Sequence, residues 1–217
     1  LLLWKLAGGM RRYHATDFSG EAVERLAVET AARGLDHVSV ERRAADDMAG
    51  RPAGPGADGR WPAIVINSVI QYFPGEDYLL RVIRGALDAL EPGGHLFIGD
   101  IRAAHVEAGF QTSIALHQAP AATDADALAA RVADALAAEK ELLVDPLWFR
   151  SLPDRLAGIA AVEIRLKRGR DCTEMTRFRY DVVIHAQAAG PAPAPLTADR
   201  TLDWGRTGMA GFAAACT

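Results

Sequence analysis

The sequence lacks the features on which several classes of protein depend. Only two cysteines, Cys172 and Cys216, occur among its 217 residues, far apart and without a CxxC pair, which excludes a disulfide scaffold and a zinc knuckle. The net charge of −4 gives no basis for binding nucleic acid, because such binding depends on lysine and arginine contacts to phosphates. No apolar run approaches the roughly 20 residues that cross a bilayer. We therefore expect a cytoplasmic protein with neither a nucleic-acid nor a membrane partner.

The composition that remains is typical of a globular domain, with 50% hydrophobic and 24% charged residues. This length allows one large α/β domain with or without a tail. The chain opens in an apolar segment, LLLWKLA, which Gly8 and Gly9 close as the C-terminus of a helix is closed. Because it also does not begin with Met, we interpret it as starting inside a domain.

Strand and helix patterns alternate in the first half of the chain. A helix is predicted between the N-cap Ser19 and Gly34, and another at Asp77–Leu90. Strands are predicted at Val38–Arg42, Ala63–Ile66 and His95–Gly99, and EPGG at Glu91–Gly94 breaks the second helix before the last of these strands. The continuous apolar run AIVI at Ala63–Ile66 is typical of a strand buried on both faces of a parallel sheet. This alternation predicts a doubly wound, mostly parallel sheet.

The second half of the chain follows a different pattern. Residues 101–156 show only helical patterns, including an Ala-rich amphipathic stretch at Asp124–Leu142. Two segments, Ala161–Gly169 and Thr176–His185, then alternate apolar and polar residues with a period of two. They predict an antiparallel pair of strands at the edge of the sheet.

The last part of the chain predicts surface and linker structure. On the second strand of the antiparallel pair, Arg177 and Arg179 are expected to face solvent or a neighbouring domain. From Ala186 onward the sequence is dominated by alanine and proline, which is typical of a linker that leads to another domain.

Ligands of doubly wound sheets bind beyond the carboxyl ends of the strands, so the residues that follow each strand are candidates for the site. These residues are Asp17, which follows the first visible strand, and Asp46, Asp47, Asn67 to Tyr72, Asp100 and Arg102. An acid after the second strand of such a sheet can accept hydrogen bonds from both hydroxyls of a ribose, so Asp17 favours a nucleoside cofactor. Asp46 or Asp47 could accept from an adenine amino group.

Each candidate has a plainer alternative. Asp17 could be a turn residue before a helix, and Asp46 and Asp47 solvated loop acids. Asp100 and Arg102 either shape the acceptor side of the site or form an ion pair at a strand end. The acids fit both a nicotinamide dinucleotide and S-adenosylmethionine. An antiparallel pair at the end of the sheet is typical of the methyltransferase variant of the fold.

The segment NSVIQYFP, at Asn67–Pro74, makes the resemblance specific. The sequence resembles the S-adenosylmethionine-dependent N-methyltransferase domains of nonribosomal peptide synthetases, and further segments keep the same order and spacing. They are TDFS at 16–19, ADD at 45–47, LEPGGHLFIGDIR at 90–102, RLKRG at 165–169 and TRFRYDVVIH at 176–185.

The resemblance implies a class I methyltransferase fold, with a C-terminal antiparallel hairpin and a helical insertion before it. It assigns residues 1–185 to the methyltransferase domain and residues 186–217 to a linker. Domains of this family carry a glycine-rich loop after their first strand, where the backbone approaches the cofactor closely. No such loop precedes Asp17, so we interpret the chain as a fragment in which the first strand and this loop are missing.

The resemblance also implies a reaction, the transfer of a methyl group from S-adenosylmethionine to the α-amino group of an aminoacyl thioester. The thioester would be held on the phosphopantetheine arm of a carrier domain, beside an adenylation domain of the same synthetase, in secondary metabolism such as antibiotic biosynthesis. The alternatives are an O- or C-methyltransferase of a related assembly line, and a non-catalytic scaffold domain without cofactor.

Site residues carry over at the positions that match the motifs. For the cofactor these are Asp17, Phe18, Asp46, Asn67 and Ser68, with Asn67 bordering the methionine end. Gln71 and Tyr72 are the catalytic candidates, which would orient the amine or the thioester carbonyl because the reaction depends mainly on alignment. The alternative for Tyr72 is that it covers the core together with Phe73. No metal is required.

Overall fold

The computed structural model describes residues 2–48, 51–56 and 58–189 and has an α/β architecture with two separate sheets. Its strands are β1 (Tyr13–Asp17), β2 (Val38–Arg42), β3 (Trp61–Asn67), β4 (Leu90–Arg102), β5 (Ile159–Leu166) and β6 (Arg179–Ala186). The smaller sheet pairs β1 with β2 in parallel. The larger sheet has the order β3-β4-β6-β5, in which β3 and β4 are parallel and β6 is antiparallel to both of its neighbours.

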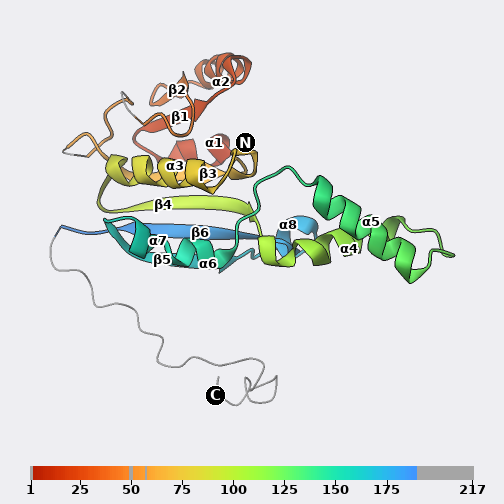
Figure 1. Ribbon diagram of the computed structural model, residues 1–217. Coiled ribbons are helices and arrows are strands. Elements are labelled where there is room, and N and C mark those ends of the chain that lie inside the picture. Colours follow the sequence, from red (N-terminus) through yellow and green to blue (C-terminus); the bar gives the residue numbers. More distant parts are fainter. Residues whose placement is uncertain (1, 49–50, 57, 190–217) are drawn as a thin grey trace.

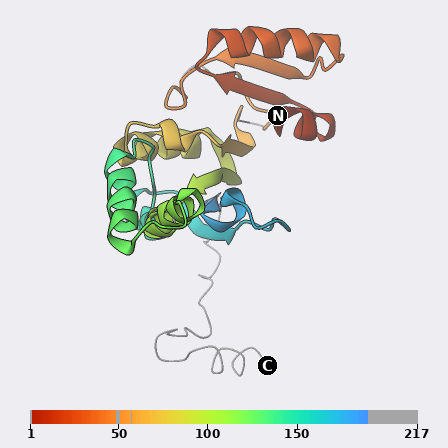
Figure 2. The ribbon, with the colours of Figure 1, turned by 90° about the vertical axis from the view of Figure 1, so that its right-hand side faces the viewer.

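The two sheets lie apart, with the β1–β2 pair and its helix separate from the larger sheet (Figure 2). In the described part of the chain, one edge of β1 and one edge of β3 carry no strand partner. The described chain therefore has the predicted α/β alternation, but its strands form two sheets, of which the larger is mixed.

The helices follow the sequence patterns closely. They are α1 (Leu2–Leu6), α2 (Gly20–Ala32), α3 (Glu76–Ala89), α4 (Glu107–Gln118), α5 (Ala125–Ala138), α6 (Pro146–Arg150), α7 (Leu152–Arg155) and α8 (Glu174–Arg177), with 3-10 turns η1 (Ala7–Gly9), η2 (Ile70–Tyr72) and η3 (Ala104–Val106). The predicted cap Ser19 accepts a hydrogen bond from the Ala22 N–H, and Asp124 accepts one from the Ala127 N–H. None of the described helices is long and apolar enough to cross a membrane.

The hydrophobic core lies between α3, the larger sheet and the short helices α6 and α7. Its fully buried side chains include Leu79, Val82, Ile83, Leu96, Ile98, Ile101, Val144, Phe149, Leu152, Val182 and Ile184. By contrast, α5 has no buried residue and extends with α4 away from the sheet (Figure 1). The helical insertion is therefore only partly supported by the core.

The prediction that Ala63–Ile66 is buried on both faces is wrong. Ile66 is buried, but the Val65 side chain is 42% exposed and Ala63 is exposed as well. The reason is that Ala63 and Val65 alternate with Ile64 and Ile66 along β3 and so lie on the opposite face of the strand, which is not packed against the core.

Both boundaries of β4 differ from those predicted. Strand β4 begins at Leu90 and includes Glu91–Gly94, the segment that was expected only to end the preceding helix. Its register with β3 shifts over this segment, from the pair Trp61–Leu90 to the pair Ala63–His95. It then continues past Gly99 to Arg102. The antiparallel hairpin is confirmed, but only β5 lies at the edge, since β6 also pairs with β4. The predicted linker lies outside the described residues from 190 onward.

Replacement of Ile184 should test the core directly. Ile184 is fully buried on β6, inside the larger sheet, and truncation of such a side chain leaves a cavity. We expect Ile184→Ala to lower the free energy of unfolding by about 2–5 kcal/mol in urea titrations. Leu166→Ala, at an 81% exposed position of edge strand β5, is the matched control and should change it by less than about 0.5 kcal/mol. Equal losses for the two variants would contradict this description of the core.

Candidate functional site

Two residues at the carboxyl ends of β3 and β4 have an unusual backbone conformation. Ser68 has φ of 56° and Asp100 has φ of 68°, a left-handed region that costs a residue other than glycine roughly 1–3 kcal/mol. The Ser68 hydroxyl donates a hydrogen bond of 2.7 Å to Asp100 Oδ2. The Asn67 amide nitrogen Nδ2 donates in turn to Ser68 Oγ at 3.1 Å. The two strand ends are therefore joined by a chain of side-chain hydrogen bonds.

Asp100 is the buried end of this series of hydrogen bonds and is held by further contacts. It is 2% exposed, and its carboxylate meets Arg179 Nη1 at 3.1 Å and Lys167 Nζ at 3.4 Å. Its backbone N–H donates to Asp181 Oδ1 at 2.8 Å, and Asp181 also pairs with Lys167. Asp100 thus forms ion pairs near a strand end, but its partners are Arg179 and Lys167 and not Arg102.

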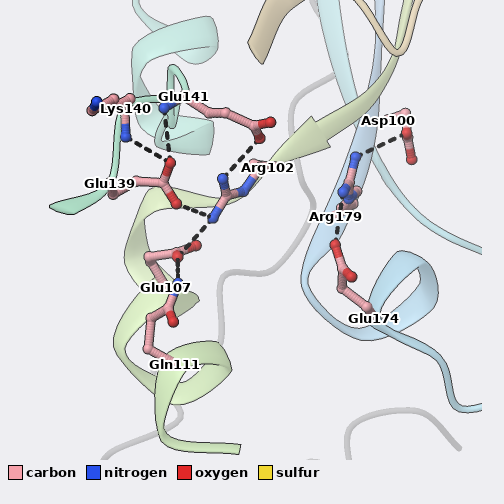
Figure 3. A network of polar contacts seen from close by, with 9 residues as sticks. All are labelled: Asp100, Arg102, Glu107, Gln111, Glu139, Lys140, Glu141, Glu174 and Arg179. Carbon is pink, nitrogen blue, oxygen red and sulfur yellow. Dashed lines mark hydrogen bonds and ion pairs between the residues drawn. The ribbon is translucent and has the colours of Figure 1, made fainter. Parts of the chain in front are cut away.

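The expectation that Arg179 faces solvent or a neighbouring domain is wrong. Its side chain is 14% exposed and is held between Asp100 and Glu174 (Figure 3). The cause is the position of β6 between β4 and β5, which places Arg179 opposite Arg102 in register and close to Asp100. The neighbouring Arg177 ends α8 and does not lie in the strand.

A second cluster surrounds Arg102, at the last position of β4. The guanidinium contacts Glu107 Oε1 at 2.7 Å, Glu139 Oε2 at 2.6 Å and Glu141 Oε2 at 2.8 Å. Figure 3 shows these three carboxylates converging on it, from α4 and from the segment between α5 and α6. The cluster therefore fastens the helical insertion to the end of the sheet.

Charge and burial act in opposite directions within the Arg102 cluster. Burial by itself would lower the pKa of Arg102, but its hydrogen bonds to Glu139 and Glu141 and the charge of Glu107 raise it. Burial raises the pKa of Glu139, yet hydrogen bonds from Arg102 and from two backbone N–H groups outweigh this and hold that pKa below its usual value. Arg102 and Glu139 therefore both favour their charged forms, and one guanidinium faces three carboxyl groups.

The turn η2 carries Gln71 and Tyr72, the two catalytic candidates. Gln71 is 6% exposed, and its side-chain oxygen Oε1 has no hydrogen-bond partner among the described residues. Its backbone oxygen accepts a hydrogen bond of 2.8 Å from the Leu142 N–H. Tyr72 is 70% exposed, whereas Phe73 is buried in the core. Of these two aromatic residues, only Phe73 covers the core.

The acids of the smaller sheet are partly engaged. Asp17 Oδ1 accepts a hydrogen bond of 2.8 Å from the Ser19 N–H, as in the turn-residue alternative, while the adjacent Phe18 ring is 74% exposed. Asp46 Oδ1 accepts a hydrogen bond of 2.8 Å from the Tyr78 hydroxyl, and Arg81 lies 4.0 Å from Oδ2. Asp46 therefore links the loop after β2 to α3.

The structure brings some of the candidate residues together and leaves others apart. Asn67, Ser68 and Gln71 lie on the short segment that leaves β3, whereas Asp17 and Phe18 belong to the other sheet and Asp46 contacts α3. No group of potential metal ligands occurs in residues 2–48, 51–56 and 58–189.

Sequence reasoning missed the carboxylates that bind Arg102. It placed Glu139 and Glu141 inside a helix that was expected to reach Leu142, but α5 ends at Ala138. The signal available in the sequence was the pair of glutamates at the end of the Ala-rich stretch, where apolar periodicity stops.

Comparison with proteins of known sequence shows that the chain is similar to a part of several nonribosomal peptide synthetases. It is 40% identical over 210 residues to chondramide synthase cmdD of Chondromyces crocatus, covering 96% of this chain and 5% of that protein. It is 38% identical over 191 residues to the probable non-canonical nonribosomal peptide synthetase CymA of Salinispora arenicola, covering 88% of this chain and 2% of that protein. The chain thus spans about one-twentieth or less of the length of these relatives. No protein-family model matches it.

Comparison of structures supports the fold. A SAM-dependent methyltransferase from Methanosarcina mazei matches with a TM-score of 0.51 and 18% identity, covering 85% of each chain. At that level of identity the likeness shows a shared fold. The synthetase resemblance and the class I methyltransferase fold predicted from the sequence motifs are both confirmed.

The Arg102 cluster predicts a characteristic dependence of stability on pH. Arg102→Met leaves three carboxylates without their cation, so we expect the free energy of unfolding near neutral pH to fall by about 3 kcal/mol. In the wild type, the lowered pKa of Glu139 contributes stability above its unfolded value, and this is lost as the pH falls through the folded pKa. In the variant, Glu139 loses the hydrogen bond and the charge of Arg102 and keeps only its two backbone hydrogen bonds against the effect of burial. Its pKa therefore rises relative to the wild type, and protonation on acidification relieves the unpaired charge.

Urea titrations at about pH 7 and about pH 4 would therefore show the gap between variant and wild type narrowing in acid. Arg165→Met, at an exposed arginine that pairs with Glu163 on the surface, is the control and should cost less than about 1 kcal/mol. A gap that stays constant with pH would contradict the role assigned to the carboxylates.

Proposed function

We propose that this chain, a relative of nonribosomal peptide synthetases with the fold of class I methyltransferases, is the S-adenosylmethionine-dependent N-methyltransferase domain of such a synthetase. Its acceptor would be the α-amino group of an aminoacyl thioester held on the phosphopantetheine arm of a carrier domain. The similarity that covers 96% of the chain supports the synthetase, and the shared fold supports methyl transfer.

The unpartnered Oε1 of Gln71 is the observation that carries the proposal of an acceptor group with a hydrogen-bond donor. A buried amide oxygen without a donor costs stability, so its presence suggests a donor that arrives with a ligand. A neutral amine has an N–H to donate, whereas a thioester carbonyl has none. Gln71 Oε1 would therefore accept a hydrogen bond from the acceptor amine, which leaves the lone pair of the amine nitrogen directed away from Oε1. The exposed hydroxyl of Tyr72 would donate to the thioester carbonyl.

The cofactor would lie along the carboxyl ends of the strands. The free oxygen of Asp17 suits the ribose hydroxyls, and the exposed ring of Phe18 offers a flat apolar face to the base. Asn67 and Ser68 would border the methionine end. Asp46 would act on the adenine side indirectly, through Tyr78, because the Tyr78 hydroxyl already donates a hydrogen bond to its carboxylate. S-adenosylmethionine supplies, when bound, a methyl group activated on a sulfonium.

The partners follow from the length of the relatives. Because the chain spans 5% of chondramide synthase cmdD, we propose that it works within a much longer synthetase, beside an adenylation domain and a phosphopantetheinyl carrier domain. In this proposal residues 1–185 are the methyltransferase domain and residues 186–217 connect it to the next domain.

Two measurements on that synthetase would test the proposal. Calorimetric titration with S-adenosylmethionine should show binding, and intact-mass analysis of the loaded carrier should show one added methyl group, located on the α-nitrogen by fragmentation. A methyl group on oxygen or carbon would overturn the choice of acceptor. Failure to bind S-adenosylmethionine would favour a non-catalytic scaffold.

Replacement of Gln71 should separate stability from activity. Gln71→Leu removes a buried amide whose oxygen is unpaired, so we expect the free energy of unfolding to rise by about 1 kcal/mol. Turnover of the loaded carrier should fall by about 10- to 100-fold, because the acceptor amine loses its orienting hydrogen bond. The dissociation constant of S-adenosylmethionine should stay the same.

The matched control is Gln118→Leu, at an exposed glutamine of α4, which should change neither turnover nor cofactor binding. Unchanged turnover in Gln71→Leu would exclude contact between Gln71 and the acceptor.

A further inference from the structure

We propose that Asp100 is a positioning residue, which fixes the Ser68 hydroxyl and, through it, the Asn67 carboxamide in the orientation that meets the cofactor. The inference rests on the proposed function for the identity of the ligand. Asp100 is 2% exposed, so its carboxylate acts on a ligand only through other side chains. Ser68, by contrast, is exposed, and Asn67 is half-buried.

The first step links Asp100 to the backbone of Ser68. Ser68 and Asp100 are the only described residues other than glycine with positive φ, and they lie on adjacent strand ends in direct contact. The Ser68 N–H donates to the Gly99 oxygen at 3.1 Å, and its hydroxyl donates to Asp100 Oδ2 at 2.7 Å. These two bonds to consecutive residues of β4 hold the turn that leaves β3 in its left-handed conformation.

The second step links Ser68 to Asn67. Nδ2 of Asn67 donates to Ser68 Oγ at 3.1 Å. On its other side, a Cβ atom added to Gly99 would lie 2.2 Å from Asn67 Oδ1, so the carboxamide occupies the space that the missing side chain leaves free. Asn67 thus has one orientation, set by the Ser68 hydroxyl and by the absence of a side chain at Gly99.

The third step is the rigidity of Asp100 itself. Arg179 from β6 and Lys167, which follows β5, both contact its carboxylate, while Asp181 accepts from its backbone N–H. Figure 3 shows Arg179 lying between Asp100 and Glu174. The Asp100 side chain is therefore held by residues of β6 and by the residue that follows β5. Groups that do not reach the ligand thus maintain the strained backbone of Ser68.

A double-mutant cycle tests this chain of contacts. Asp100→Asn suits the left-handed backbone, but it replaces a charged acceptor with one neutral amide oxygen, which the Ser68 hydroxyl and Arg179 Nη1 would share as they now share Oδ2, so the link to Ser68 weakens. In the synthetase, Asp100→Asn and Ser68→Ala should each weaken the binding of S-adenosylmethionine by about 10-fold. The double variant should be no weaker than either single variant, because both remove the same link.

Glu174→Gln is the matched control. It changes a carboxylate on the far side of Arg179, 2.7 Å from Nη2, and should leave the dissociation constant of S-adenosylmethionine unchanged. Unfolding temperatures of all variants would show that they fold. Multiplicative losses in the double variant, or equal losses in Glu174→Gln, would overturn the positioning role.

A measurement without cofactor keeps this inference separate from the proposed function. In the 217-residue chain, one side-chain amide hydrogen of Asn67 should exchange slowly by nuclear magnetic resonance. That protection should be lost in Asp100→Asn and Ser68→Ala but kept in Glu174→Gln. Loss of protection together with no cofactor binding by the wild-type synthetase would overturn the proposed function alone. Protection that survives Asp100→Asn would overturn the positioning role whatever the ligand.

Discussion

The arrangement of the candidate site depends on the ion pairs that the Arg102 guanidinium forms with three carboxylates. The guanidinium binds carboxylates from α4 and from the segment between α5 and α6, whereas α5 itself contributes no buried residue to the core. Because the core supports the helical insertion only in part, the position of the insertion depends also on this ionic cluster. A buried arginine is stable there because several acceptors replace its lost hydration.

The same residue connects the insertion to the catalytic candidates. The Arg102 backbone oxygen accepts a hydrogen bond from the Val144 N–H. Two residues earlier than Val144, the Leu142 N–H donates a hydrogen bond to the backbone oxygen of Gln71. The Tyr180 hydroxyl also donates to the Val144 oxygen from inside the core. The segment from Glu139 to Val144 therefore bridges the ends of β3 and β4, and Gln71 is buried as a consequence. An unpaired oxygen at such a place is a feature of binding sites more than of cores.

Local patterns in the sequence were sufficient for most of the secondary structure. Helix α2 begins after the Ser19 cap as predicted, β2 matches its predicted bounds, and the alternating segments form an antiparallel pair. These features depend on periodicity and on capping side chains, which act within a few residues. The candidates in the turn after β3 were also accessible from sequence, because ligands of parallel sheets meet the ends of the strands.

What the sequence could not determine are the partners of the charged residues. Arg179 was expected at the surface, yet it lies against Asp100 because β6 is inserted between β4 and β5. The left-handed backbone of Ser68 and Asp100 likewise depends on contacts between two strands far apart in the chain. The sequence by itself determined which segments form helices and strands and which residues follow them. Only the tertiary structure decided which charges meet, because ion pairs and buried hydrogen bonds depend on which strands become neighbours.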